Sequence, residues 1–176
     1  HVAGLAVHRG EVPHPAARKL VAFLVEPSGA HRDPLHRRHA PARELRYVDA
    51  VRDALHVAMS RNRNVVLIRQ DIAEYGGVFK ATERFVSEFG RERVRNTPII
   101  ESGAIGCAMG LALDGFVPMI EMQFGDFISC GFNQIVNNLA KNHYRWGARV
   151  GVVIRSPVGG GTGGGPFHSQ NVESWF

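Results

Sequence analysis

Four residues of the sequence have side chains suited to chemistry and follow apolar segments: Glu101, Gln123, Phe127 and His168. Carboxylates and histidines are the groups that acid–base catalysis uses most often. Glu101 lies between the apolar stretches TPII and GAIG, which favours burial, and a buried carboxylate requires a partner. Each residue also has a structural interpretation. Glu101 would complement a helix dipole, Phe127 would belong to the core, and His168 would be a surface histidine.

A run of six glycines in seven positions, Gly159–Gly165 (GGGTGGG), separates an apolar segment from His168. Such a run is typical of a flexible linker, but its position favours equally a loop over a site. It is not a phosphate-binding loop, because no Gly-Lys-Ser/Thr follows it. It also lacks the strand–Gly-x-Gly-x-x-Gly–helix arrangement of a dinucleotide site.

Spacing argues against two other kinds of site. Gly125-Asp126-Phe127 followed by Asn137-Asn138 imitates a magnesium–diphosphate motif, but it lacks the final glycine and is too short. No cluster of His, Cys and Asp has metal-ligand spacing, so we expect no such metal site. Neither Ser102 nor Ser169 lies in the Gly-x-Ser-x-Gly elbow of a hydrolase.

The pattern of apolar residues predicts the elements that would position these side chains. Helical spacing predicts helices over four ranges: 47–58, 80–89, 101–113 and 126–144. Short apolar runs predict strands over 65–69, 117–123 and 150–155, an extended segment over 94–100, and a lone strand over 20–25. This alternation predicts an α/β fold, with a mostly parallel sheet and helices on both faces. Ligands bind such sheets at the carboxyl ends of the strands, where the four candidates fall.

Composition limits the number of domains and the kind of partner. The chain has 176 residues, of which 44% are hydrophobic and 21% charged, and this fits one folded domain without a membrane span. Much of the net charge of +5 lies in residues 1–46, which are rich in Pro and His and which we interpret as a basic arm or linker. Residues 47–176 are then the folded domain. That domain is nearly neutral and has no basic stripe, which argues against a nucleic-acid partner.

Several long stretches carry a family resemblance. They include YGGVFKATERF (75–85), FNQIVNNLAKNHYRWG (132–147) and the segments 89–128 and 152–176. Tyr47 to Phe176 resembles the N-terminal half of the beta chain of thiamine-diphosphate-dependent 2-oxo acid dehydrogenases. The resemblance implies the transketolase-like pyrimidine-binding fold, truncated at its C-terminal end and without the family's C-terminal domain. It also makes the linker of an alpha–beta fusion one interpretation of residues 1–46.

The same resemblance implies roles for the candidate residues. The carboxylate of Glu101 would hydrogen-bond the aminopyrimidine ring of thiamine diphosphate and drive it to the tautomer that deprotonates the thiazolium carbon. Phe127 would pack against that ring, with Ile99 and Gln123 beside it. His168 would transfer protons or orient the intermediate and the lipoyl group. The implied reaction is oxidative decarboxylation of a 2-oxo acid with acyl transfer to lipoyl.

The implied partners follow from the same family. An alpha chain would bind Mg²⁺ and the diphosphate, and a second beta chain would complete an alpha-two, beta-two tetramer. A lipoyl domain and the core acyltransferase of the complex would receive the acyl group. The backbone carbonyls of Val152 and Val153 fall where such chains hold a structural monovalent cation. The location would be the cytoplasm in a bacterium and the mitochondrial matrix in a eukaryote.

Three alternatives stand beside this interpretation. The segments EMQFGDF and YGGVF favour a branched-chain substrate, and pyruvate is the first alternative. A non-catalytic assembly module with the same fold is the second. Another thiamine enzyme, such as a transketolase or a deoxyxylulose-phosphate synthase, is the third, although the HSQ and GGG stretches match those enzymes poorly. Asn133 and Asn138 stand where the family has acids, which would alter a subunit contact and leave the site unchanged.

Overall fold

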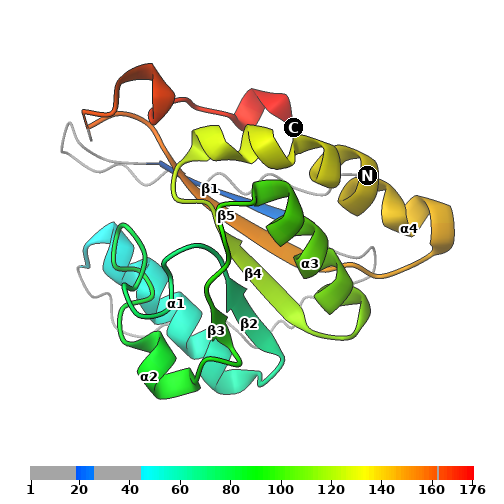
Figure 1. Ribbon diagram of the computed structural model, residues 1–176, viewed down its shortest axis with the longest axis horizontal. Coiled ribbons are helices and arrows are strands. Elements are labelled where there is room, and N and C mark those ends of the chain that lie inside the picture. Colours follow the sequence, from blue (N-terminus) through cyan, green and yellow to red (C-terminus); the bar gives the residue numbers. More distant parts are fainter. Residues whose placement is uncertain (1–18, 26–44, 162) are drawn as a thin grey trace.

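The computed structural model describes residues 19–25, 45–161 and 163–176, in which a five-stranded sheet lies between helices (Figure 1). The strand order is β1-β5-β4-β2-β3. The neighbouring pairs formed by β2, β3, β4 and β5 are parallel, and β1 pairs antiparallel with β5. The strands are β1 (Lys19–Val25), β2 (Val65–Ile68), β3 (Val94–Arg95), β4 (Val117–Glu121) and β5 (Val152–Val158). The predicted α/β fold with a mostly parallel sheet is confirmed.

Alternate residues of the central strands face two separate cores. Val66 and Ile68 of β2 join a core with α3 (Glu101–Leu113), while Val65 and Leu67 join a core with α1 (Tyr47–Arg61) and α2 (Phe85–Phe89). Successive side chains of a strand point to opposite faces, so a strand covered on both sides must be apolar throughout. The sequence VVLI of β2, buried at all four positions, meets that requirement.

The parallel register brings the ends of three strands to one edge of the sheet. Ile68 of β2 lies opposite Ile120 of β4, and Glu121 lies opposite Arg155 of β5. The residues that follow β2 and β4, beginning with Arg69 and Met122, therefore leave the sheet at the same edge. This is the edge at which the sequence placed the candidate residues.

The helix predicted over 80–89 is shorter than expected. Only α2, Phe85–Phe89, is helical, and Gly90 ends it as predicted. Lys80 and Arg84 have left-handed backbone angles, with φ of 59° and 70°, which a right-handed helix does not accommodate. The Thr82 hydroxyl donates a hydrogen bond to the carbonyl of Ile72 at 2.8 Å. This tertiary contact holds the segment in turns before the helix begins.

The helix predicted over 126–144 is confirmed in its extent, since residues 125–146 are helical throughout, but it is not a single α-helix. The chain forms a 3-10 helix η2 (Gly125–Gly131), a π-helix η3 (Gln134–Leu139) and a short α-helix α4 (Ala140–Trp146). Glycine has low helix propensity, and Gly131 ends η2 in close contact with α3. A Cβ built at Gly131 would lie 2.3 Å from Cδ1 of Ile105. Packing against α3 thus imposes a geometry that local periodicity does not encode.

The extended segment predicted over 94–100 contains only a two-residue strand, Val94–Arg95. Thr97 still donates its backbone N–H to the carbonyl of Arg69 at 3.1 Å. Pro98 has no N–H to continue the ladder, and the chain then turns into α3 at Glu101. The end of β2 and the start of α3 are tied together by this connection.

The strand predicted over 20–25 is confirmed as β1. It pairs along its whole length with β5, from Lys19 opposite Val158 to Val25 opposite Val152. Most of the predicted arm lies outside the described residues, so a domain boundary after residue 46 stays a prediction. None of the helices in the described part of the chain has the length and apolar character needed to cross a membrane.

Candidate functional site

Glu101 is held at the first position of α3 by an arginine from the neighbouring strand end. Its side chain is 11% exposed, and Nη2 of Arg69 donates to its Oε1 at 2.7 Å. Arg69 directly follows β2 and is fully buried. The sequence predicted burial and a partner for this carboxylate, and in the structure it is partly buried and paired with Arg69.

Three phenylalanines and one histidine form an aromatic cluster, which consists of Phe79, Phe124, Phe127 and His168. The ring of His168 lies edge-on to Phe124, with centroids 4.6 Å apart, and to Phe127, with centroids 5.4 Å apart. Phe124 also makes edge-to-face contacts with Phe127 and Phe79, both at 5.8 Å. These separations fall in the range preferred by aromatic pairs, so the cluster fixes the position of the imidazole.

The glycine run brings His168 to this cluster. The chain leaves β5, passes through the glycines and a 3-10 turn η4 (Gly165–Phe167), and reaches His168. A Cβ built at Gly164 would lie 2.7 Å from the Cβ of His168, so only glycine permits this approach. Farther along, the backbone N–H of Gln170 donates to Oδ1 of Asp126 at 3.4 Å. Of the two interpretations of the run, the geometry favours the loop beside a site over the linker.

Helix η2 connects the aromatic cluster to Glu101. Phe127 lies within η2, and Gly131 at its end packs against the first turn of α3, where a Cβ built at Gly131 would be 3.7 Å from the carbonyl carbon of Glu101. Phe127 and His168 therefore touch directly, while Glu101 reaches the same region through the packing of η2 on α3. The sequence placed these three residues at one edge; in the structure Phe127 and His168 are in contact, and Glu101 is paired with Arg69 at the end of β2.

Two other candidates are less closely associated. Gln123 is buried at the end of β4, next to Phe124, but the described residues give it no hydrogen bond to Glu101 or His168. Ile99 is 74% exposed and lies two residues before α3. Their contacts with a ligand stay predictions.

Val152 and Val153 lie inside the sheet. They belong to β5, whose backbone is paired on one side with β1 and on the other with β4. Within the described ranges, no group of three or more His, Cys, Asp and Glu side chains is arranged to hold a metal ion. A monovalent cation at the carbonyls of these two valines stays a prediction.

The sequence interpretation missed Arg69 and Phe124. Arg69 is the last residue of the strand predicted over 65–69, and nothing local indicates that its side chain turns inward to Glu101. Phe124 could have been found, because it lies between Gln123 and Gly125 at a predicted strand end. Its ring bridges Phe79 and His168, so it is the central member of the cluster.

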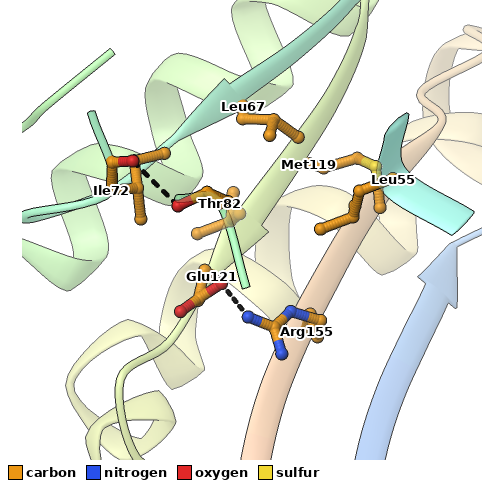
Figure 2. A pocket seen from close by; sticks show the side chains of 8 residues that line it. Leu55, Leu67, Ile72, Thr82, Met119, Glu121 and Arg155 are labelled. Carbon is orange, nitrogen blue, oxygen red and sulfur yellow. Dashed lines mark hydrogen bonds and ion pairs between the residues drawn. The ribbon is translucent and has the colours of Figure 1, made fainter. Parts of the chain in front are cut away.

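A second buried ion pair lies beside the core that α1 covers. Arg155 and Glu121 are paired next to a small cavity (Figure 2), and their side chains are 9% and 7% exposed. Burial lowers the pKa of the Arg155 guanidinium to about 10, and nearby Tyr47 opposes that shift. The cavity is lined mainly by apolar side chains, among them Leu55 of α1 and Leu67 of β2. This small, mostly apolar space has the character of a core defect rather than of a binding site.

Glu101 and the aromatic cluster together suit a flat heteroaromatic ligand. The carboxylate has a second oxygen, Oε2, that can accept a hydrogen bond, and Phe127 and Phe124 supply apolar ring surface. Four buried polar atoms in the described residues have no hydrogen-bond partner, and all belong to residues near this edge of the sheet: Nε and Nη1 of Arg69, Oδ2 of Asp126 and Oγ of Ser156. Buried polar groups are normally satisfied, so this edge has hydrogen-bonding capacity left over for another molecule.

The sequence of this chain is similar to those of known proteins. Residues 43–176 match the sequence model of a family described as "Transketolase, pyrimidine binding domain". The chain is 42% identical over 136 residues to the 2-oxoisovalerate dehydrogenase subunit beta of Bacillus subtilis, an alignment that covers 75% of this chain and 41% of that protein. It is 37% identical over 147 residues to a mitochondrial 2-oxoisovalerate dehydrogenase subunit beta of Chaetomium thermophilum, covering 81% and 31%.

A relative with another substrate in its name is about as similar. The pyruvate dehydrogenase E1 component subunit beta of Staphylococcus aureus is 39% identical over 132 residues, which cover 74% of this chain and 41% of that protein. The chain thus spans between about a third and two fifths of the length of these relatives. The family match over residues 43–176 includes Glu101 and the aromatic cluster.

Proposed function

The chain belongs to the transketolase pyrimidine-binding domain family, and from this premise we propose that it binds the aminopyrimidine ring of thiamine diphosphate in a 2-oxo acid dehydrogenase. The observation that carries the proposal is the partly buried carboxylate of Glu101, which is paired with Arg69 and lies at the start of the helix on which η2 packs, together with the aromatic cluster of Phe127 and His168. A carboxylate of this kind binds a ring nitrogen, and the aromatic side chains exclude water from around it.

Glu101 has the central part in this proposal. Its Oε1 is engaged by Arg69 at 2.7 Å, which leaves Oε2 to share a proton with the ring nitrogen. The low exposure of the side chain, 11%, strengthens that hydrogen bond by reducing competition from water. Phe127 contacts the flat face of the ring, with Gln123 and Ile99 at its margins. When bound, the cofactor supplies the carbon nucleophile and the electron sink for decarboxylation.

His168 acts on the substrate side of the site. Its imidazole is fixed between Phe124 and Phe127, with centroid distances of 4.6 and 5.4 Å. A histidine fixed in this way can give or take a proton at a ring nitrogen without losing its orientation. We assign to it proton transfer to the substrate and orientation of the incoming lipoyl group.

The proposal includes partners, because the relatives are named as beta subunits. An alpha chain would bind Mg²⁺ and the diphosphate, a second beta chain would complete the tetramer, and a lipoyl domain would pass the acyl group to the core acyltransferase. The relatives include bacterial and mitochondrial proteins. We therefore propose the cytoplasm in a bacterium and the mitochondrial matrix in a eukaryote.

The proposal is tested with the complete protein that carries this chain, reconstituted with its alpha partner. We expect saturable binding of thiamine diphosphate with Mg²⁺, and cofactor-dependent release of CO₂ from 3-methyl-2-oxobutanoate faster than from pyruvate. A faster reaction with pyruvate would change the proposed substrate from the branched-chain 2-oxo acid to pyruvate and leave the proposed enzyme class unchanged. Absence of both binding and CO₂ release would contradict the proposal and favour the assembly module.

Replacement of His168 by Phe separates its chemistry from its packing. Phenylalanine keeps an aromatic ring against Phe124 and Phe127 but cannot transfer a proton. We expect kcat for acyl transfer to fall about 10²-fold or more, and the Kd for thiamine diphosphate to change less than about threefold. Isothermal titration and steady-state assays measure the two quantities. An unchanged kcat would remove His168 from the reaction.

A further inference from the structure

Arg69 is a buried cation at the edge of the sheet where the candidate site lies. Its side chain has no exposure to solvent. Its backbone is fixed on both sides, because its N–H donates to the carbonyl of Arg95 and its carbonyl accepts from Thr97, both at 3.1 Å. Removing a guanidinium from water costs free energy unless its charge is paired. The contacts of Arg69 therefore show what its burial serves.

The only ion pair of Arg69 within the described residues is with Glu101. One nitrogen, Nη2, donates to Oε1 at 2.7 Å, whereas Nε and Nη1 are buried without a partner. A guanidinium offers five N–H donors in a fixed plane, and a purely structural pair would be expected to use two of them on one carboxylate. The single contact holds one oxygen of Glu101 and leaves the other uncommitted.

We propose that Arg69 is a positioning residue for Glu101, which orients the carboxylate through Oε1 and presents Oε2 to the ring nitrogen of thiamine diphosphate. The inference rests on the proposed function. A carboxylate accepts about four hydrogen bonds, so the arginine and the ring nitrogen do not compete for the same lone pairs. The covalent attachment of Arg69 to the end of β2 and of Glu101 to α3 fixes both partners before any ligand arrives.

The charge of Arg69 adds to this positioning. A lysine at position 69 keeps a cation next to the carboxylate, whereas a methionine removes it. The two substitutions therefore separate the charge of Arg69 from the geometry of its donors.

The test uses three substitutions in the complete protein reconstituted with its alpha partner, with thiamine diphosphate and Mg²⁺ as the probe. Arg69→Met removes the charge and the donors, and Arg69→Lys keeps the charge with a different donor geometry. Arg95→Met is the matched control. The backbone of Arg95 pairs with β2, but its side chain is 53% exposed and forms an ion pair with Glu92. The Kd is measured by titration. The tautomer of the bound ring is measured by near-ultraviolet circular dichroism without substrate.

We expect Arg69→Met to raise the Kd at least about tenfold and to reduce the dichroism of the imino tautomer. Arg69→Lys should restore most of that dichroism, and Arg95→Met should leave both readouts unchanged. A purely structural residue would not show this recovery by lysine. Wild-type values for Kd and dichroism in a folded Arg69→Met protein would overturn the inference, while loss of binding by the unsubstituted protein would overturn the proposed function.

A double-mutant cycle covers the case in which Arg69→Met does not fold. Arg69→Gln, which removes the charge and keeps a polar side chain, is combined with Glu101→Gln, and the Kd of each single and double variant is compared. If Arg69 acts through Glu101, the single variant Arg69→Gln raises the Kd, but glutamine at position 69 adds less than about a twofold change once residue 101 is Gln. An equally large effect of Arg69→Gln in both backgrounds would contradict the inference, because the arginine would then act independently of the carboxylate.

Discussion

Replacing Glu101 by Gln is expected to lower the rate of 2-oxo acid decarboxylation about 10²- to 10⁴-fold, which is the usual range for a catalytic acid–base group. Glutamine keeps the shape of the side chain and an acceptor oxygen for Nη2 of Arg69, which donates to Oε1 of Glu101 at 2.7 Å. It cannot exchange a proton with a ring nitrogen. The loss should therefore appear in kcat, measured as CO₂ release by the reconstituted enzyme.

The control for this variant is an exposed carboxylate. Glu92 is 86% exposed and pairs with Arg95 on the surface, so Glu92→Gln should leave the rate unchanged. Glu101→Gln leaves Arg69 as an uncompensated buried charge, so its thermal unfolding is recorded in parallel. A folded Glu101→Gln protein with full activity would remove Glu101 from the mechanism.

The second large effect concerns stability, at the buried ion pair between Glu121 and Arg155. Arg155→Met is expected to lower the free energy of unfolding by about 3–5 kcal/mol, because it leaves the carboxylate of Glu121 buried and unpaired. The side chains of Arg155 and Glu121 are 9% and 7% exposed. Natural domains are stable by only about 5–15 kcal/mol, so this single change removes a large part of the total. Chemical denaturation measures the loss.

Two further variants show that the cost comes from the unpaired charge. The double variant Glu121→Leu with Arg155→Met removes both charges, and we expect it to be more stable than Arg155→Met alone, since apolar replacements of buried pairs are often tolerated. Arg91→Met breaks an exposed pair with Glu74, 2.6 Å long, and should cost less than about 1 kcal/mol. If Arg155→Met lowers the free energy of unfolding no more than Arg91→Met does, burial of the Glu121–Arg155 pair does not contribute to stability.

The sequence predicted the parts of the fold that local pattern determines. The helix expected over 101–113 has the bounds Glu101–Leu113 in the structure, and the apolar runs became β2, β4 and β5 with small shifts at their ends. The family resemblance, carried by four long stretches, is confirmed by the match over residues 43–176. Apolar strands and a glycine-rich helix are sufficiently distinctive to be recognised without tertiary information.

The sequence did not predict features that depend on contacts between distant segments. The turns before α2 are held by Thr82 on the carbonyl of Ile72, and the shape of η2 depends on Gly131 against α3. The pairing of Arg69 with Glu101 joins residues that are 32 positions apart. Periodicity within a short window contains no information about such pairs, so the site could be located from the sequence while its hydrogen bonds could not.

The π-helix η3 sets the rotational phase of the helix that follows it. Each residue of an α-helix turns the chain by about 100°, so one residue fewer between Gln134 and Leu139 would rotate all of α4 by about that angle. Tyr144 and Trp146 of α4 are 94% and 66% exposed. The direction in which these two aromatic side chains project is therefore fixed by the six residues before α4. A single-residue deletion in η3 would redirect them without altering any residue of α4.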